Sequence, residues 1–251
     1  QRQMCIRDSY TLKATAGTDY KIRIEYMQAG AEALLRFDLG IYRHISPEMV
    51  VDRVKEADIV IFAGGISPSL EGEEMYSVNS PGFAGGDRTS IELPQVQRDI
   101  LKALKKAGKK VVFVNCSGSA VALVPEMESC DAILQAWYPG QSGGLAVADV
   151  LFGDFNPSGK LPVTFYKNTD QLPDFEDYSM KNRTYRYMTE APLFPFGYGL
   201  SYTTFDISKG RLNKKTISAG QGLNFKVNVK NTGKYDGAEV IQVYVRKVDD
   251  A

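Results

Sequence analysis

The middle of the chain alternates short apolar runs with longer runs in which apolar residues recur every three or four positions. The short runs have the length of β-strands and lie at 59–63, 111–115, 132–138 and 161–165. The longer runs have the period of α-helices and lie at 46–57, 94–107, 119–127 and 145–152. Strands that alternate with helices predict a mostly parallel sheet with helices on both faces, so the expected fold class is α/β.

Capping residues mark the borders of these predicted helices. Ser46 followed by Pro47 is typical of an N-cap with a proline in the first turn. Gly108 and Gly153 stand where the second and the last helix should stop.

The start of the chain shows the period of two that is typical of β-strands. In residues 10–42 the stretch YKIRIEY places apolar and aromatic residues on one face and charged residues on the other, and a second short strand is expected at 33–39. Two or three strands cannot stand alone. We therefore expect the tail of a β-sandwich, or alternatively a hairpin packed on the next domain.

The end of the chain is also β-like. Apolar and polar residues alternate from 223 to 230, a turn is expected at 231–233, and a further strand at 240–245. This pattern predicts half or more of an immunoglobulin-like sandwich. Residues 167–200 are rich in Asp, Tyr and Pro without a clear period, which predicts a long ordered connection.

The first nine residues, QRQMCIRDS, fit no structural pattern and resemble translated sequencing-adapter sequence. We exclude them from the fold prediction. We then expect the chain to begin in the middle of a protein, and to stop in the middle of a domain at Ala251, directly after a strand pattern.

Composition and charge narrow the classes of function. A chain of 251 residues predicts two or three domains, and its 30 basic and 30 acidic side chains give no net field to attract nucleic acid or an anionic membrane. No stretch approaches the roughly 20 apolar residues that a membrane span needs. The chain has a single histidine, His44, and its three cysteines form neither a disulfide framework nor a metal-ligand spacing. Most zinc sites and most triad chemistry are thereby excluded.

A long loop between the strand at 59–63 and the helix that begins at Pro94 carries the candidate chemistry. It holds three carboxylates within four positions, Glu71, Glu73 and Glu74, just past the carboxyl end of a strand. Open α/β sheets bind ligands at that edge. Clustering and burial keep carboxyl groups protonated at higher pH, so such a cluster can supply a proton donor. The alternative is a solvated acidic loop.

Two glycine-rich segments resemble known motifs but lack their partners. Gly140–Gly144 matches the G-x-S-x-G nucleophile elbow, yet no histidine follows Ser142, so a turn with Ser142 or Gly143 near a helix cap is the better interpretation. Gly64-Gly65 has neither dinucleotide nor P-loop spacing, so no nucleotide cofactor is expected.

Charged and aromatic residues outside the regular elements have two interpretations each. The segment GGDRT at 85–89 should turn the loop back, with Asp87 and Arg88 as scaffold rather than substrate ligands. The aromatic segments at 183–187 and 192–202 can stack on sugar rings, but a clasp between two domains is favoured.

Together these segments resemble one family. The stretches AGGISPSLEGEEM, GGDRTSIELP, WYPGQSGGLAVADVLFGDFNPSGKLPVTF, RTYRYM and PLFPFGYGLSYTTF resemble the C-terminal half of glycoside hydrolase family 3, over about residues 45–251. The strands at 10–42 resemble the end of the carbohydrate-binding β-sandwich that some members carry inserted in their α/β domain.

The resemblance implies a retaining, exo-acting β-glycosidase that removes terminal non-reducing β-D-xylosyl or β-D-glucosyl residues from oligosaccharides or from aryl and alkyl β-glycosides. It implies Glu71 as the general acid/base, with Glu73 and Glu74 as fallback candidates, and no metal or organic cofactor. The aspartate nucleophile belongs to a barrel domain that these residues do not include. The LEGEEM form of the loop favours β-xylosides, and a periplasmic or secreted setting follows by analogy.

The resemblance also gives the expected domain organisation. The parts are an artefact at 1–9, a remnant of the inserted β-sandwich at 10–42, an α/β sandwich domain at 43–172, an interdomain connection at 173–200, and a truncated fibronectin type III-like domain at 201–251. We expect the chain alone to be inactive, because a retaining mechanism needs two carboxyl groups. The competing hypothesis is a non-catalytic carbohydrate-binding or adhesion module on the same fold.

Overall fold

The computed structural model describes residues 10–27, 30, 35, 37–41, 44–72 and 79–246. The chain divides into two compact units, Gln1–His44 and Ile45–Ala251, and each is described by itself.

The strands predicted in the first unit are not found among its described residues. Residues 10–27 contain a turn at 16–17 but no strand, and residues 35 and 37–39 of the second predicted strand are irregular as well. The predicted apolar face is exposed, with Ile22 at 58%. Apolar and polar residues do alternate along this stretch of sequence. However, no neighbouring sheet buries the apolar face in the part of the chain that the structure describes. The remainder of the second predicted strand, 33–34 and 36, lies outside the described residues.

A three-stranded parallel sheet organises the second unit. Its strands are β1 (Ile59–Gly65), β5 (Lys110–Cys116) and β6 (Ala132–Gln135), in the order β1-β5-β6. The prediction of parallel strands is confirmed by the pairing of β1 with β5 and of β5 with β6. The third strand is shorter than predicted because Trp137 adopts a left-handed backbone with φ of 57°, which an extended strand cannot accommodate.

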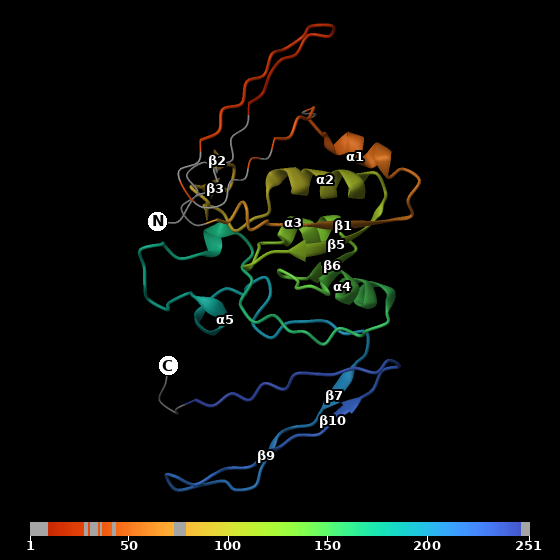
Figure 1. The fold of residues 1–251 in the computed structure, drawn as a ribbon. Coiled ribbons are helices and arrows are strands. Elements are labelled where there is room, and N and C mark those ends of the chain that lie inside the picture. The colour runs from red at the N-terminus through yellow and green to blue at the C-terminus, as the bar shows by residue number, and fades with distance from the viewer. Residues whose placement is uncertain are drawn as a thin grey trace. The chain divides into compact units, whose positions relative to one another are not determined.

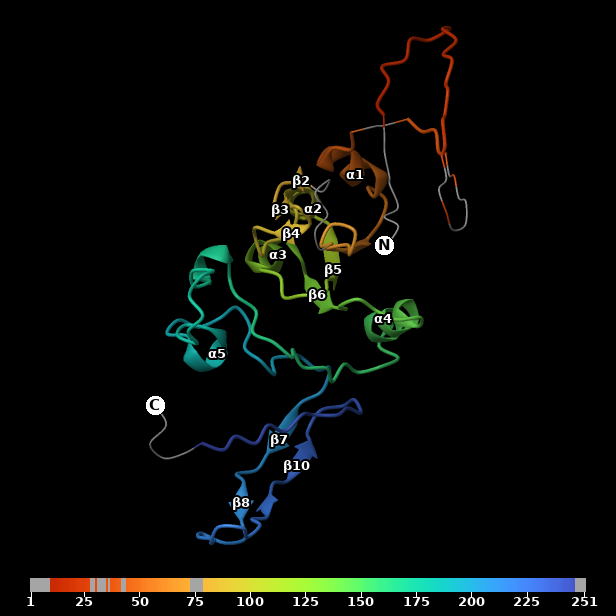
Figure 2. The ribbon, with the colours of Figure 1, turned by 60° about the vertical axis from the view of Figure 1, so that its left-hand side comes forward.

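Four helices accompany this sheet: α1 (Pro47–Arg53), α2 (Gln95–Lys106), α3 (Val124–Ser129) and α4 (Gly143–Phe152). Helices α2 and α4 lie on opposite sides of the three strands (Figures 1 and 2). The predicted caps are confirmed: the Ser46 side chain accepts a hydrogen bond from Met49 N, and Gly153 ends α4 in a left-handed conformation.

Two helix borders were wrong. Helix α1 ends at Arg53, where the chain passes into a turn, and not near residue 57. Helix α3 begins at Val124 rather than 119, because residues 118–119 form a bend and Ala122 forms a bridge with Glu92 instead of a helical turn. Pro125 then stands in the first turn, where a missing N–H is tolerated.

The core lies where α2 packs on the sheet. Leu101 and Leu104 of α2 and Val111 and Phe113 of β5 are fully buried. Leu101 and Leu104 are three residues apart and so lie on one face of the helix, while Val111 and Phe113 are two residues apart and so lie on one face of the strand. These two apolar faces pack on each other. Each fully buried Leu or Phe contributes about 1.5–3 kcal/mol relative to exposure.

A buried ion pair joins α2 to α3 beside this core. Arg98 Nε donates to Glu126 Oε1 at 3.0 Å, and the Glu126 side chain is 1% exposed. Burial raises the pKa of Glu126, and the positive charge of Arg98 opposes that rise. The second carboxylate oxygen has no partner among the residues that the structure describes.

The long loop after β1 contains a small antiparallel sheet that the sequence did not predict. It consists of β2 (Asn79–Ser80), β3 (Phe83–Ala84) and β4 (Asp87–Arg88) in that order, beyond the carboxyl ends of the parallel strands (Figure 1). Gly85 and Gly86 adopt positive φ between β3 and β4, which confirms that this segment turns the loop back.

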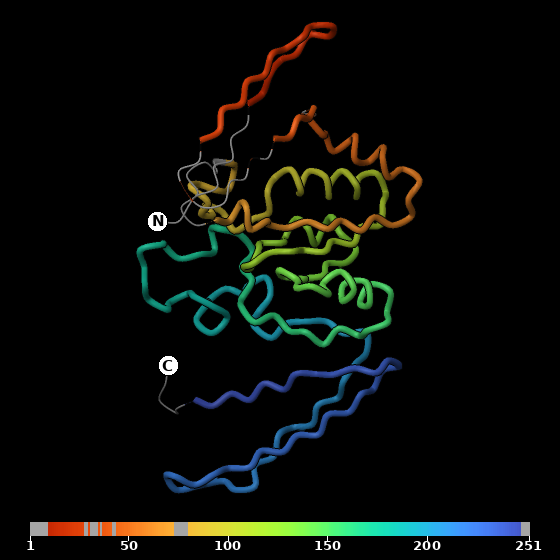
Figure 3. Tube along the Cα trace, viewed as in Figure 1, coloured from red at the N-terminus to blue at the C-terminus, as the bar shows by residue number. Residues whose placement is uncertain are grey.

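The last strand predicted for the main sheet, 161–165, is not a strand. It runs instead along 194–198, where Phe165 and Phe194 exchange backbone hydrogen bonds of 2.9 and 3.2 Å. Pro162 and Pro195 have no N–H to donate, so a regular ladder cannot form. Figure 3 shows the irregular path that follows, which holds the 3₁₀ turn η1 (Thr169–Gln171) and the helix α5 (Thr184–Tyr187).

Aromatic rings pack on one another in this connection, whereas the clasp between two domains stays a prediction. Rings pair at centroid distances of 4.5 Å for Phe194 and Tyr198, 5.8 Å for Tyr185 and Phe196, and 6.3 Å for Phe165 and Phe194. Such pairs contribute about 0.5–1.5 kcal/mol each beyond the area that they bury.

The C-terminal part forms two short antiparallel pairs. Strand β7 (Phe205–Ile207) pairs with β10 (Val229–Asn231), and β8 (Arg211–Leu212) pairs with β9 (Phe225–Lys226). The strand predicted at 240–245 was wrong: these residues are irregular, and Val245 is 92% exposed. No ladder partner for them occurs among the described residues.

The ion pair between α2 and α3 gives the first prediction. Arg98→Met should lower the free energy of unfolding by about 3–5 kcal/mol, because it leaves the Glu126 carboxylate buried without a counter-charge. The double variant Arg98→Met with Glu126→Gln should recover most of that loss in urea denaturation. A double variant that costs the sum of both single losses would contradict this explanation.

Candidate functional site

The carboxyl edge of the parallel sheet is fixed by a glycine and a glutamine. Gly65 ends β1 with φ of 125°, and a Cβ there would stand 1.9 Å from Cys116 O, so only glycine lets β1 and β5 approach. The Gln97 side chain of α2 accepts from Gly65 N at 2.8 Å and donates to Gly65 O at 2.6 Å. The acidic loop, residues 64–93, therefore leaves the sheet from a rigid point.

Glu71 stands at this edge and receives hydrogen bonds from two neighbouring loops. Ser119 Oγ, after β5, donates to Glu71 Oε1 at 3.0 Å, and Tyr138 OH, after β6, lies 3.3 Å from Oε2. The same phenol lies 2.8 Å from Ile66 O. The Glu71 side chain remains 24% exposed. The three parallel strands thus each contribute, through the segment that follows them, to holding one carboxylate.

Arg88 supplies the positive charge beside this carboxylate. Its Nη1 lies 3.7 Å from Glu71 Oε1 and donates to Ser119 Oγ at 2.7 Å and to Ala120 O at 3.2 Å. Burial lowers the pKa of the Arg88 guanidinium, and the negative charge of Glu71 opposes that effect. Arg88 thus links the acidic loop to the segment after β5, which fits the scaffold interpretation.

Tyr138 is a dependable donor at this edge. Burial and, next, the negative charge of Glu71 raise the pKa of its phenol above the ordinary value. The phenol therefore keeps its proton throughout the neutral range.

A buried polar network lies beneath Glu71 at the ends of β5 and β6. Asn115 and Ser117 are fully buried, and Asn115 Nδ2 donates to Gln135 Oε1 at 2.6 Å. Ser117 Oγ donates to Ser119 O at 2.9 Å. This network fixes the turn from which Ser119 reaches Glu71.

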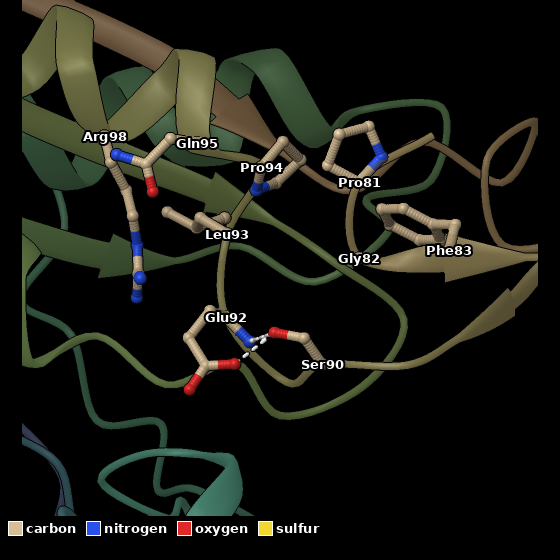
Figure 4. A pocket seen from close by; sticks show the side chains of 9 residues that line it. All are labelled: Pro81, Gly82, Phe83, Ser90, Glu92, Leu93, Pro94, Gln95 and Arg98. Carbon is tan, nitrogen blue, oxygen red and sulfur yellow. Dashed lines mark hydrogen bonds between the residues drawn. The ribbon is translucent and has the colours of Figure 1, made fainter. Parts of the chain in front are cut away.

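A pocket of about 340 Å³ opens beside the acidic loop, where the loop enters α2. Figure 4 shows Ser90 bonded to Glu92 on one side of it and Arg98 reaching toward it from α2. Glu92 also accepts from Thr169 N at 2.9 Å and from Thr169 Oγ1 at 2.6 Å. Glu71 does not line this pocket. The Glu92 carboxylate is already satisfied by the protein, which identifies it as a structural anchor between the loop and η1.

The structure places the predicted site residues unequally. Glu71 lies at the expected edge of the sheet, while Glu73 and Glu74 lie outside the described residues. Ser142 is the N-cap residue of α4, in agreement with the turn interpretation. Sequence reasoning missed Ser119 and Tyr138 as partners of Glu71. The signal was partial: Ser119 comes shortly after the predicted strand at 111–115, but Tyr138 was predicted to be the last residue of the strand at 132–138.

No group of three metal-ligating side chains suitable for a metal ion occurs in the described part of the chain. Among the described helices, none is both long and apolar enough to cross a membrane.

Comparison with known proteins identifies the family of this chain. Residues 9–202 match the family model described as the glycosyl hydrolase family 3 C-terminal domain. The chain is 58% identical over 240 residues to a xylan 1,4-beta-xylosidase of Xylanibacter ruminicola, which covers 95% of this chain and 27% of that protein. It is 42% identical over 219 residues to a periplasmic beta-glucosidase of Salmonella typhimurium, over 81% of this chain and 27% of that protein. The chain thus spans about a quarter of the length of these curated relatives.

Solved structures agree in fold. A β-glucosidase of Erythrobacter marinus matches 74% of this chain and 24% of its own with a TM-score of 0.63 at 36% identity. The β-glucosidase of Listeria innocua in complex with isofagomine matches 76% of this chain and 27% of its own with a TM-score of 0.58 at 31% identity. These similarities support an α/β region with a parallel sheet followed by small antiparallel sheets.

Glu92 gives a prediction about pH. Burial would raise the pKa of Glu92, but the hydrogen bonds from Ser90 and Thr169 outweigh it and lower the pKa from 4.5 to about 2. Above about pH 4.5 this depression stabilises the folded chain, and the stabilisation is lost as pH falls toward 2. We expect Glu92→Gln to be less stable than the parent at pH 7, with the difference shrinking toward pH 2 in urea denaturation. The exposed Glu176→Gln serves as control, and a pH-independent difference for Glu92→Gln would refute the linkage.

Proposed function

Because this chain belongs to glycoside hydrolase family 3, we propose that it is the C-terminal part of a retaining, exo-acting β-glycosidase. Its substrates would be oligosaccharides or aryl and alkyl β-glycosides with a terminal non-reducing β-D-xylosyl or β-D-glucosyl residue. The observation that carries this proposal is the 58% identity to a xylan 1,4-beta-xylosidase over 95% of the chain. The same similarity favours the xylosyl residue. The periplasmic beta-glucosidase among the relatives supports a periplasmic or secreted setting.

We assign the general acid/base to Glu71. Its carboxylate stands at the carboxyl edge of a parallel sheet, is partly exposed, and is oriented by Ser119 and Tyr138. General acid/base catalysis needs a carboxyl group with a fixed position and access to the glycosidic oxygen. Glu73 and Glu74 remain the fallback candidates.

The second carboxyl group of the reaction comes from another part of the enzyme in this proposal. In a retaining mechanism one carboxylate attacks the anomeric carbon while the other protonates the leaving oxygen, and the two groups stand about 5 Å apart. The acid then becomes a base that takes a proton from water as the glycosyl-enzyme is hydrolysed. We place the attacking aspartate in a barrel domain of the same polypeptide.

The domain division proposed from the sequence fits this assignment. The boundary between compact units at His44 and Ile45 lies two residues from the proposed border between the 10–42 remnant and the α/β domain. The antiparallel pairs β7–β10 and β8–β9 support a fibronectin type III-like domain from 201 onward.

The isolated chain should not hydrolyse a nitrophenyl β-xyloside. It carries the proposed acid/base but not the proposed nucleophile, so no glycosyl-enzyme can form. The measurement is nitrophenolate release by the purified chain, with the full-length enzyme as positive control. Release that is abolished by Glu71→Gln would show that a nucleophile is present in this chain and would overturn the division of labour.

Glu71→Gln in the full-length enzyme tests the assignment directly. The rate on substrates with poor leaving groups should fall about 10²–10⁴-fold, since protonation of the leaving oxygen is lost. A dinitrophenyl glycoside should form the glycosyl-enzyme nearly normally, and azide should rescue its turnover as a nucleophile that needs no general base. Glu73→Gln and Glu74→Gln are assayed in the same way, and the exposed Glu128→Gln serves as the control. If Glu71→Gln is silent and either neighbour is crippling, the assignment to Glu71 is wrong.

A further inference from the structure

Arg88 connects three segments that are far apart in the sequence. It lies in β4, at the exit of the acidic loop, and its Nε donates to Ser90 O at 3.2 Å. Its Nη1 reaches Ser119 and Ala120 in the segment after β5. The same nitrogen lies 3.7 Å from Glu71 near the start of the loop. One guanidinium thus holds the entrance and the exit of the loop against a neighbouring loop.

Ser119 links Arg88 to the carboxylate of Glu71 by two hydrogen bonds. Its hydroxyl accepts from Arg88 at 2.7 Å and donates to Glu71 Oε1 at 3.0 Å. A hydroxyl that accepts from a cation has its own proton directed at the remaining acceptor, so the two bonds strengthen one another. Arg88 therefore orients Glu71 both directly and through Ser119.

The burial of Arg88 is not explained by a gain in folding stability. Its side chain is 11% exposed, and Nη2 is buried without a hydrogen-bond partner among the described residues. A whole buried ion pair can often be replaced by apolar side chains of similar volume without loss of stability. A planar fork that reaches several oxygens at fixed angles is what an arginine offers and an apolar side chain does not.

We propose that Arg88 is a positioning residue of the proposed reaction: acting directly and through Ser119, it fixes the Glu71 carboxylate where a glycosidic oxygen can receive its proton. The proposal rests on the proposed function of Glu71. Arg88 itself touches no reacting atom in this scheme, so its removal should misplace the acid rather than remove it. When a mutation away from the reacting bond displaces a reacting group by about 1 Å, the rate can fall about 10²-fold.

The leaving-group dependence of the full-length enzyme tests this role. Arg88→Met should lower kcat/KM about 10–100-fold for alkyl xylosides, which need protonation, and only a few-fold for dinitrophenyl xyloside. Arg88→Lys should fall between Arg88→Met and the parent, because lysine keeps the charge but not the fork. Ser119→Ala should show the same selective loss without removing a buried charge. Arg211→Met, an exposed change in β8, is the matched control.

Hydrogen exchange provides a readout that is independent of catalysis. In Arg88→Met, backbone amides at 66–72 and 86–90 should exchange faster, while those of α4 should remain as in the parent. An equal loss of kcat/KM for all leaving groups, or unchanged exchange in both segments, overturns the role of Arg88. A crippling Glu71→Gln with a harmless Arg88→Met also overturns that role, but it leaves the function of Glu71 standing. A harmless Glu71→Gln overturns the assignment of Glu71 and, with it, the role given to Arg88.

Discussion

The close parallel pairing of β1 and β5 is the constraint on which the site depends. Gly65 lies opposite Cys116, and no side chain can be accommodated at that point. Because β5 also pairs in parallel with β6, all three strands end at one edge. Glu71, Ser119 and Tyr138 can meet only for that reason, since 67 positions separate the first from the last. The arrangement of these three residues therefore depends first on the parallel direction of the strands and only then on any single side chain.

Buried polar groups in this chain are placed where they connect elements. Asn115 and Ser117 link β5 to β6, Glu126 links α3 to α2, and the partly buried Glu92 links the acidic loop to η1. Burying such groups is unfavourable unless hydrogen bonds compensate the lost water. The hydrogen bonds that these groups do make require their partners to be in place when the chain folds, which makes the geometry of the sheet edge specific.

The sequence predicted regular elements best where local pattern and tertiary packing agree. Helix α2 and strand β5 carry clear periods and clear stops, and both form the core. The segment 161–165 looks like a strand but packs on 194–198, because prolines interrupt its hydrogen bonding. The apolar face at 20–26 has a strand period yet no sheet in the described residues. Similarly, the position after a strand singled out the cluster of Glu71, Glu73 and Glu74, and the family resemblance selected Glu71 within it. Ser119 and Tyr138 escaped because serine and tyrosine are common in loops, and only the register of the sheet brings them to Glu71.

The two oxygens of Glu71 are held differently, and this difference bears on the proposed chemistry. Oε1 faces Ser119 and the Arg88 cation, while Oε2 has the Tyr138 phenol at 3.3 Å. The phenol can yield Oε2 to a substrate without losing its own hydrogen bond, because Ile66 O lies 2.8 Å away. In the proposed mechanism Oε2 would be the oxygen that meets the glycosidic bond, while Oε1 is the one by which Ser119 and Arg88 hold the carboxyl group in place.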